Sequence, residues 1–296
     1  MAGVILVFGG NGQVGWELQR SLAVLGAVVP LDRAAVDLAS PAAISALIAA
    51  QRPRAIINAA AYTAVDRAEQ ERELAFAINA TAPAAMAAAA AMAGIPFIHY
   101  SSDYVYAGNK PGVYVETDAT GPLSAYGRSK LAGDEAVLAA GGQAVILRTS
   151  WVYAARGANF MKTMLRLADE RDSLRVVGDQ VGAPTSAELL ADVAAQVLKQ
   201  MWGNAGLRGV YHCAAAGETS WHGYASFVIG EARRLGAPLK VDAANIVAIT
   251  TADYPLPAPR PAYSMLESSL LAKALNLELP PWQAGVDSVL RALRAD

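Results

Sequence analysis

Short apolar segments alternate with longer helical segments through the first half of the chain, and this alternation restricts the possible folds more than any other feature. The apolar segments cover residues 4–8, 27–31, 55–58, 96–101 and 144–149. Helical patterns cover residues 14–25, 41–51, 73–93 and 124–140. Strands that are apolar on both faces and separated by helices form a parallel sheet covered on both sides. The sequence therefore predicts an α/β protein with a doubly wound parallel sheet, the Rossmann arrangement.

A glycine-rich turn lies between the first apolar segment and the first helix. Its glycines have the spacing G-x-x-G-x-x-G across residues 9–15. Residues without a Cβ let the chain turn sharply and let backbone N–H groups approach a pyrophosphate at the helix N-terminus. An ordinary strand-to-helix turn can have the same glycines, but the flanking strand and helix favour a dinucleotide site. The candidate cofactor ligands in this turn are Gly9, Asn11, Gly12, Gln13 and Val14.

The end of the second strand carries two opposed cues about the cofactor. Asp32 and Arg33 stand where a doubly wound fold reads the adenosine ribose. A carboxylate there accepts hydrogen bonds from the ribose hydroxyls and favours NADH, whereas a guanidinium pairs with a 2′-phosphate and favours NADPH. The sequence leaves both cofactors open. Further candidate cofactor ligands follow the second and third strands: Asp37, Leu38, Ala61, Tyr62 and Thr63.

Composition excludes several classes of protein. Of 296 residues, 54% are hydrophobic and 17% charged, which is typical of a globular chain. The net charge is −2 and basic residues are scattered, so we expect no nucleic-acid partner. One cysteine and three histidines argue against disulfides and zinc. The N-terminal apolar run is short, and residues 81–95 are mostly alanine, so we expect a cytoplasmic protein without a membrane anchor.

The regular alternation ends near Thr149, and the Pro-rich segment 254–261 cannot be a regular helix or a central strand. We therefore expect residues 1–150 to form the dinucleotide-binding domain, with some later segments returning to it. Residues 151–296 should form mainly a smaller α/β substrate lobe.

Tyr126 and Lys130 stand four residues apart in a predicted helix, and therefore lie on one face of it. A free tyrosine has a pKa of about 10, and a nearby ammonium moves that pKa toward neutrality. Ser102, at the end of the fourth strand, is placed to hydrogen-bond a substrate carbonyl. An exposed Tyr–Lys pair has the same spacing, but the glycine turn, the hydroxyl and this pair occur in the chain order of a dinucleotide reductase. We predict that Tyr126 delivers a proton while the cofactor delivers a hydride, and that Lys130 also holds the nicotinamide ribose.

Seven stretches make a more specific pattern that runs nearly end to end. They are residues 12–15 (GQVG), 58–66 (NAAAYTAVD), 102–106 (SDYVY), 126–133 (YGRSKLAG), 148–153 (RTSWVY), 179–185 (DQVGAPT) and 260–264 (RPAYS). In these the chain resembles the extended short-chain dehydrogenase/reductase family and, within it, the dTDP-4-dehydrorhamnose reductases. The last three stretches distinguish this subfamily from its relatives.

The resemblance implies a reaction and a catalytic trio. The reaction is the NADPH- or NADH-dependent reduction of the C4 keto group of dTDP-4-dehydro-6-deoxy-L-mannose to dTDP-L-rhamnose, the last step of dTDP-rhamnose biosynthesis. The trio maps to Ser102, Tyr126 and Lys130. Threonine is more frequent in the family at the first of these, and this exchange keeps the hydroxyl. Many relatives have histidine where Tyr62 stands, so that polar contact with the cofactor can differ.

The same resemblance implies a dTDP-linked keto-deoxyhexose as the small-molecule partner, with Trp151 as an apolar wall against the hexose. A core aromatic is the other interpretation of this tryptophan. Some relatives form dimers through a divalent cation bound by glutamates, and Glu17 and Glu188 are available for Mg²⁺, although nothing local demands a metal. A homodimer is therefore possible. The candidate substrate ligands are Ser102, Asp103, Tyr104, Trp151, Asn159 and Arg260.

The alternatives to a reductase are a dehydratase, an epimerase and a regulatory subunit. A dehydratase of this fold needs an Asp-Glu pair after the strand-end hydroxyl, but Asp103 is followed here by Tyr104. An epimerase uses the same trio and stays open. A dinucleotide-binding regulatory subunit also stays open, although the intact trio argues against it.

Overall fold

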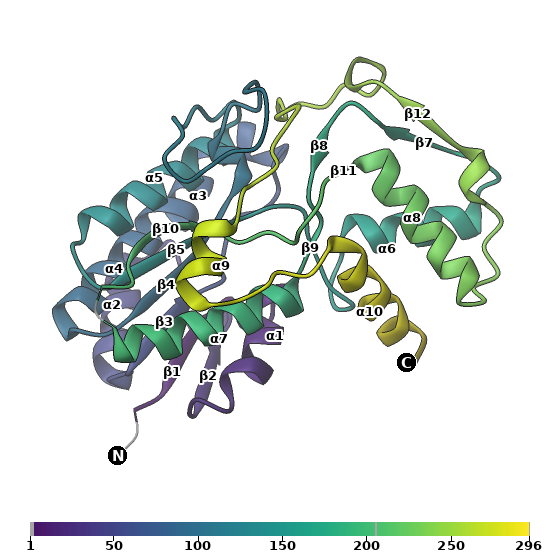
Figure 1. The fold of residues 1–296 in the computed structure, drawn as a ribbon. Coiled ribbons are helices and arrows are strands. Elements are labelled where there is room, and N and C mark those ends of the chain that lie inside the picture. The colour runs from purple at the N-terminus through teal and green to yellow at the C-terminus, as the bar shows by residue number, and fades with distance from the viewer. Residues whose placement is uncertain (1–2, 205, 296) are drawn as a thin grey trace.

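The computed structural model describes residues 3–204 and 206–295, and a six-stranded parallel sheet is its main feature (Figure 1). In spatial order the strands are β10 (Gly209–His212), β5 (Ala144–Thr149), β4 (Phe97–Ser102), β3 (Ala55–Asn58), β1 (Ile5–Phe8) and β2 (Val28–Leu31). The chain begins at β1, adds β2 on one side and then crosses to β3 on the other. Ligands of such sheets bind at the carboxyl ends of the strands beside this reversal. The doubly wound parallel sheet is confirmed.

Helices cover both faces of this sheet (Figure 1). One face is covered by α1 (Gln13–Leu22), α7 (Ala187–Gly203) and α9 (Ser269–Leu275). The other face is covered by α2 (Pro41–Gln51), α4 (Ala82–Ala93) and α5 (Ala125–Ala139). The helix starts follow local sequence: the Ser40 hydroxyl caps α2, and the Ser124 hydroxyl caps α5. These caps fix where the two helices leave the preceding loops.

The alanine-rich segment forms a helix packed on the sheet. It consists of α3 (Arg72–Phe76), the π-helical turn η2 (Ala77–Thr81) and α4. Within the described part of the chain, Arg72–Ala93 is the segment long and apolar enough to pass a membrane-span test, with a mean hydropathy of 1.5. It packs against α2, α5, β3 and β4. Small alanine side chains allow this close approach of the helix to the sheet.

The second half of the chain divides its elements between the sheet and a smaller C-terminal part. α7, β10 and α9 return to the sheet, and β10 pairs with β5 as the sixth strand. The smaller part contains α6 (Phe160–Glu170), α8 (Trp221–Arg234) and α10 (Trp282–Ala295). Its short strand pairs are β7 (Leu174–Val177) with β12 (Ile246–Ile249), β8 (Val181–Gly182) with β11 (Thr219–Ser220), and β6 (Val152–Tyr153) with β9 (Thr185–Ser186).

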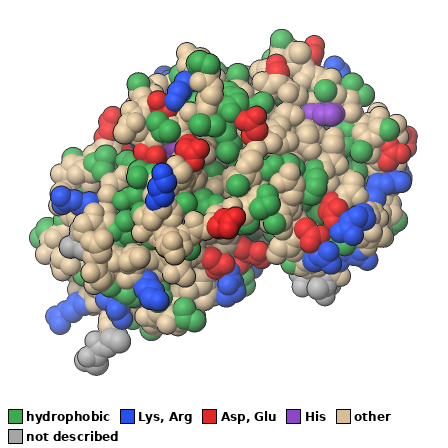
Figure 2. All heavy atoms as spheres, in the orientation of Figure 1, with side chains coloured by type: hydrophobic (Ala, Val, Ile, Leu, Met, Phe, Trp, Pro, Cys, Tyr) green, Lys and Arg blue, Asp and Glu red, His purple; other side chains and the backbone are tan. Residues whose placement is uncertain are grey.

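The remaining short elements are 3-10 turns: η1 (Arg67–Glu69), η3 (Asp103–Val105), η4 (Ala243–Asn245) and η5 (Thr251–Asp253). Figure 1 shows the smaller part on the right, beside the carboxyl ends of the sheet strands. On the face drawn in Figure 2, basic side chains are interspersed with acidic ones and form no continuous basic stripe.

Candidate active site

The glycine turn connects β1 to α1 and is tightly packed. Gly9 has φ +80°, in the left-handed region that favours glycine. A Cβ on Gly15 would lie 2.1 Å from the Gly9 carbonyl oxygen, so no larger residue fits there. Gly12 is the N-cap of α1 and has no side chain that could occupy the first amides of the helix. The turn therefore presents helix N–H groups at the carboxyl edge of the sheet, which suits a pyrophosphate.

The end of β2 is joined to this turn through Asp32. Its Oδ2 accepts a hydrogen bond of 2.8 Å from the Asn11 side chain. Its Oδ1 accepts from the N–H groups of Ala34 and Ala35 at 2.9 and 3.1 Å. Arg33 beside it is exposed. The Asp32 carboxylate is thus already hydrogen-bonded within the protein, whereas Arg33 is exposed to solvent.

The next two cofactor candidates differ in exposure. Asp37 is exposed, and its carboxylate accepts from the N–H of Ala39 at 2.9 Å. Leu38 is half-buried and packs against the core under α2.

The loop after β3 brings Tyr62 to the site, while Ala61 is half-buried and Thr63 is exposed. The Tyr62 phenol donates to Glu71 at 2.6 Å, so the ring that replaces the family's histidine has a partner within this chain.

Asn79, in the π-helical turn η2, fixes this loop. Its side chain accepts from the Tyr62 N–H at 2.8 Å, and donates to the Tyr62 carbonyl and to Ser129 at 3.0 and 2.9 Å. Sequence analysis missed Asn79, because an asparagine inside an alanine-rich helix carries no motif.

Ser102 ends β4, and Tyr126 and Lys130 lie on α5. Burial raises the pKa of Tyr126 to about 12, and the Ser102 hydroxyl opposes this shift. Lys130 is fully buried, and its Nζ donates to the Tyr100 carbonyl at 2.6 Å. Burial lowers the pKa of Lys130 to about 8, although Asp134 opposes that shift. The sequence predicts a lowered pKa for Tyr126, whereas in the structure burial raises it and the charges of Asp103 and Asp134 act in the same direction as burial.

Asp103 and Tyr104 follow Ser102 in the turn η3. The Asp103 carboxylate is buried and accepts from the Ser102 hydroxyl at 3.0 Å. Burial raises its pKa to about 6. The Tyr104 ring packs edge-on against the Tyr126 ring, with centroids 5.4 Å apart. Asp103 therefore contacts the Ser102 hydroxyl, and Tyr104 contacts the Tyr126 ring.

Trp151 lies just after β5 with φ +47°, an unusual conformation for a bulky side chain. Its indole stacks on Trp221 of α8, with centroids 3.6 Å apart and planes at 10°. The indole also lies over Gly182, where a Cβ would come within 2.8 Å of it. Strained residues of this kind are frequent at functional sites.

Asn159 and Arg260 each connect the two parts of the chain. Asn159 caps α6, and its Nδ2 donates to the Gln13 side chain at 2.9 Å, so a substrate candidate contacts a cofactor candidate. The Arg260 guanidinium pairs with Asp66 at 2.8 and 3.0 Å. Sequence spacing gave no sign of either contact.

A cavity of about 590 Å³ lies between α6, β7 and the Pro-rich segment. Its lining is mostly apolar but includes Arg171, Arg175 and Arg260. Trp221 lines the cavity and stacks on Trp151, so the cavity lies next to this pair of stacked indoles. Sequence analysis did not predict the cavity, because its walls come from segments that are distant along the chain.

Among the described residues, no group of three or more His, Cys, Asp or Glu side chains is placed to hold a metal ion. Burial and the neighbouring charge of Glu188 raise the pKa of Glu17. Glu188 also accepts from Ser288 at 3.1 Å.

Comparison with known proteins agrees with this geometry. The family model described as the RmlD substrate binding domain matches residues 3–295. The dTDP-4-dehydrorhamnose reductase of Burkholderia thailandensis is 47% identical over 293 residues, covering 98% of both chains. The reductase of that name from Escherichia coli K12 is also 47% identical, covering 98% of this chain and 97% of its own.

Solved structures extend the comparison to the fold. The dTDP-4-dehydrorhamnose reductase of Clostridium acetobutylicum superposes with a TM-score of 0.90 at 35% identity, covering 98% of this chain and 99% of that one. The Bacillus anthracis reductase, solved in complex with NADP, gives 0.89 at 33% identity and covers 99% and 100%. By its sequence, its family model and its structure, this chain belongs to the dTDP-4-dehydrorhamnose reductase family.

Proposed function

We propose that the protein uses NADPH or NADH to reduce the C4 keto group of dTDP-4-dehydro-6-deoxy-L-mannose, giving dTDP-L-rhamnose. The observation that carries this proposal is that the Ser102 hydroxyl, at the carboxyl end of β4, lies within hydrogen-bonding reach of the Tyr126 phenol on α5, with Lys130 one turn further along that helix. The identity to curated reductases along nearly the whole chain supports the same reaction.

The cofactor site is built from the glycine turn and the strand ends that follow it. Gly9, Gly12 and the first amides of α1 receive the pyrophosphate, because no Cβ or side-chain cap occupies that space. A bound nicotinamide supplies the hydride. Lys130 holds the nicotinamide ribose through its buried ammonium, and the adenosine end lies near Asp32 and Arg33. The remaining proposed cofactor contacts are Asn11, Gln13, Val14, Asp37, Leu38, Ala61, Tyr62 and Thr63.

Tyr126 supplies the proton. With a pKa raised to about 12, its phenol is protonated at neutral pH and can give that proton to the substrate oxygen as negative charge develops there. The Ser102 hydroxyl, which donates to Asp103 in the unliganded structure, turns to donate its proton to the same substrate oxygen and orients the carbonyl. The charge of Lys130 stabilises the phenolate that remains, and solvent then returns a proton to it.

The sugar nucleotide occupies the region from Trp151 to the C-terminal cavity. Trp151 is the apolar wall for the hexose, with Asp103, Tyr104 and Asn159 around its hydroxyls. Arg260 at the cavity edge is suited to a diphosphate, because a guanidinium offers paired charge-assisted donors. A volume of about 590 Å³ with apolar walls suits the nucleoside.

The proposed cellular setting rests on the composition of the chain and on its family. We place the protein in the cytoplasm, with a sugar nucleotide as its partner and with neither nucleic acid nor membrane. Residues 1–150 act as the dinucleotide-binding domain, with α7, β10 and α9 added to it, and residues 151–296 act mainly as the substrate lobe. We also propose a homodimer with Mg²⁺ at Glu17 and Glu188, because the charge of Glu188 acts on Glu17.

The decisive experiment follows NADPH absorbance with dTDP-4-dehydro-6-deoxy-L-mannose and with its UDP-linked analogue. We expect oxidation of NADPH with the dTDP compound at the higher kcat/KM. If purified protein instead contains tightly bound NAD and interconverts sugars without consuming cofactor, it is an epimerase. If it binds cofactor, reduces neither sugar and purifies with a larger enzyme, the regulatory interpretation replaces the reductase.

A further inference from the structure

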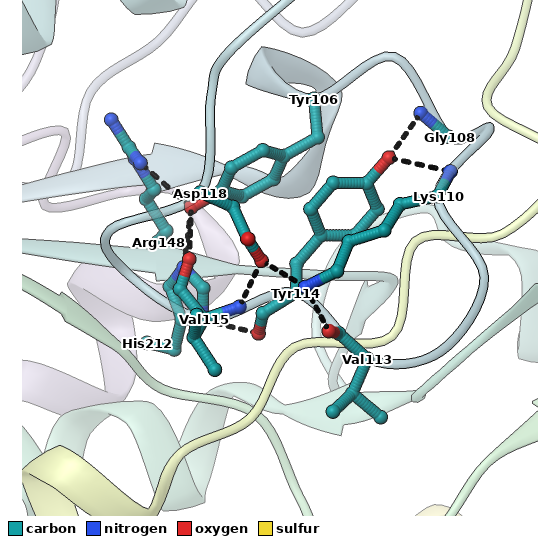
Figure 3. A network of polar contacts seen from close by, with 9 residues as sticks. All are labelled: Tyr106, Gly108, Lys110, Val113, Tyr114, Val115, Asp118, Arg148 and His212. Atoms are coloured by element: carbon teal, nitrogen blue, oxygen red, sulfur yellow. Dashed lines mark hydrogen bonds and ion pairs between the residues drawn. The ribbon is translucent and has the colours of Figure 1, made fainter.

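A network of buried polar side chains lies behind the catalytic lysine, between α5 and the sheet. It consists of Asp134 on α5, Arg148 on β5, Tyr106 after η3 and His212 on the edge strand β10. Figure 3 shows its outer half, where Arg148, Tyr106 and His212 meet beneath the loop that carries Tyr114 and Asp118. None of these four residues belongs to the proposed catalytic or binding set.

The hydrogen bonds of this network have a defined direction. His212 contacts the Tyr114 carbonyl through Nδ1 at 3.1 Å, which requires the proton on that nitrogen and leaves Nε2 as an acceptor. Tyr106 donates to this Nε2 at 2.7 Å and accepts from Arg148 at 2.8 Å. Burial and the charge of Arg148 lower the pKa of His212 to about 4, so the imidazole stays neutral. On this side, the Arg148 guanidinium therefore contacts a neutral phenol, which is itself bound to a neutral imidazole.

The other end of Arg148 binds Asp134. Its Nε donates to Asp134 Oδ2 at 2.9 Å, and both side chains are buried. The second carboxylate oxygen, Oδ1, makes no hydrogen bond to any described residue. Asp134 follows Lys130 by four residues on α5, so the two side chains share one face of that helix. Burial raises the pKa of Asp134, while the charge of Arg148, the neighbouring Ser101 hydroxyl and the charge of Lys130 oppose this shift and favour the carboxylate. The carboxylate charge in turn opposes the lowering of the Lys130 pKa.

The surroundings of Lys130 show why this charge matters. A buried ammonium is unfavourable without a partner, and its hydrogen bond in the structure goes to a neutral carbonyl, that of Tyr100. His99 on β4 is neutral, because burial and Lys130 itself hold its pKa well below 6.5. Arg148 on β5 is a cation, and the Tyr126 phenol is neutral at physiological pH. Of these neighbours, Asp134 alone brings negative charge to Lys130.

We propose that Asp134, oriented by Arg148, is a positioning residue that keeps the Lys130 side chain charged and in place for the cofactor ribose and for Tyr126. This inference rests on the proposed reductase function for its catalytic meaning. The competing interpretation is that the Asp134–Arg148 ion pair only anchors α5 to β5. In that case, removing the charge of Asp134 would leave the proton affinity of Lys130 unchanged.

The test is the pH dependence of NADPH binding, measured by nucleotide fluorescence in the Asp134→Asn variant. An asparagine keeps the shape and an oxygen acceptor for Arg148, but removes the charge. In the wild type, binding should weaken as the pH rises through the pKa of Lys130, which is about 8 in the unliganded protein. We expect the midpoint of Asp134→Asn to fall by about one pH unit or more. The kcat of this variant at pH 7.5 should fall about tenfold.

The matched control is Tyr106→Phe, which perturbs the same network by removing a buried hydrogen-bond partner of Arg148 but leaves the carboxylate charge. Its melting temperature should fall while its binding midpoint stays at the wild-type pH. A folded Asp134→Asn protein with the wild-type midpoint overturns the proposal.

If Asp134→Asn does not fold, Asp134→Glu carries the test, because it retains the charge. Its midpoint should stay within about half a pH unit of the wild type, and a fall of one unit or more contradicts the inference. Because the titration needs no sugar substrate, it stands even if the keto-sugar nucleotide is not reduced.

Discussion

The region under α5 and the C-terminal cavity are built in opposite ways. Around Lys130 and Arg148, charged groups are buried and hydrogen-bonded to protein atoms. The cavity walls are mostly apolar, and among its arginines Arg260 is tied to a partner, Asp66. Chemistry needs reacting groups whose charge and direction are set in advance, whereas recognition of a large ligand needs area and a few polar anchors. Mutations should therefore affect turnover and cofactor binding in the first region, and affinity for the sugar nucleotide in the second.

The largest expected effect comes from the proton donor. Tyr126→Phe keeps the ring but removes the hydroxyl, so kcat should fall about 10³-fold while the dissociation constant for NADPH changes less than about twofold. Steady-state kinetics and fluorescence titration measure the two quantities. Near-normal turnover in this variant would remove Tyr126 from the catalytic role.

Lys130→Met should lower the activity of the protein but raise its thermal stability. We expect kcat to fall about 10²-fold and NADPH binding to weaken. Folding lowers the pKa of Lys130 from 10.5 to about 8, so its charge disfavours the folded state below pH 8, and this cost is lost as the pH rises toward 10.5.

The unliganded Lys130→Met protein should therefore melt above the wild type at pH 7, by about 3 °C, with a smaller difference at pH 9. Calorimetry at the two pH values checks this. A melting temperature that falls at pH 7 would contradict the assigned cost of burying this charge.

Substitutions in the cavity should change the affinity for the sugar nucleotide more than the turnover. Arg260→Ala removes the guanidinium proposed for the diphosphate, so the KM for the sugar nucleotide should rise about tenfold with kcat within about threefold. Asp66→Asn is the control, because it loosens the ion pair but leaves the guanidinium in place. If both variants raise KM equally, Arg260 acts through its ion pair and not through the ligand.

The smallest effect is expected at the exposed end of β2. Arg33→Ala should weaken NADPH binding about fivefold more than NADH binding, since only NADPH carries the 2′-phosphate. Parallel titrations with the two cofactors provide the measurement. Equal losses would exclude Arg33 from cofactor choice.

Much of the fold was predictable because its signals are local. Apolar segments of four to six residues mark the strands, the caps at Ser40 and Ser124 mark two helix starts, and the glycine spacing marks the turn. The sixth strand, β10, was not assigned by the alternation, because the chain enters the smaller part before it returns to the sheet. Pairing between strands that far apart leaves no periodic pattern in the sequence.

The residues of the candidate site also fall into two groups, those with a local signal in the sequence and those without one. Tyr126, Lys130 and Ser102 were found because their spacing and order are themselves a signal. Asn79 was missed because its value lies in contacts with Tyr62 and Ser129.

The sequence by itself determined the parallel sheet and the glycine turn, and it predicted the reacting side chains, since each depends on residue types at short spacing. Only the tertiary structure decided their proton affinities. Tyr126 holds its proton more tightly than its spacing from Lys130 predicts, and Lys130 holds its own less tightly than a solvated lysine. The physical reason is burial: removing water and placing Asp134 and Arg148 nearby changes the energy of a charge, and neither the depth of burial nor the neighbours can be read from local sequence.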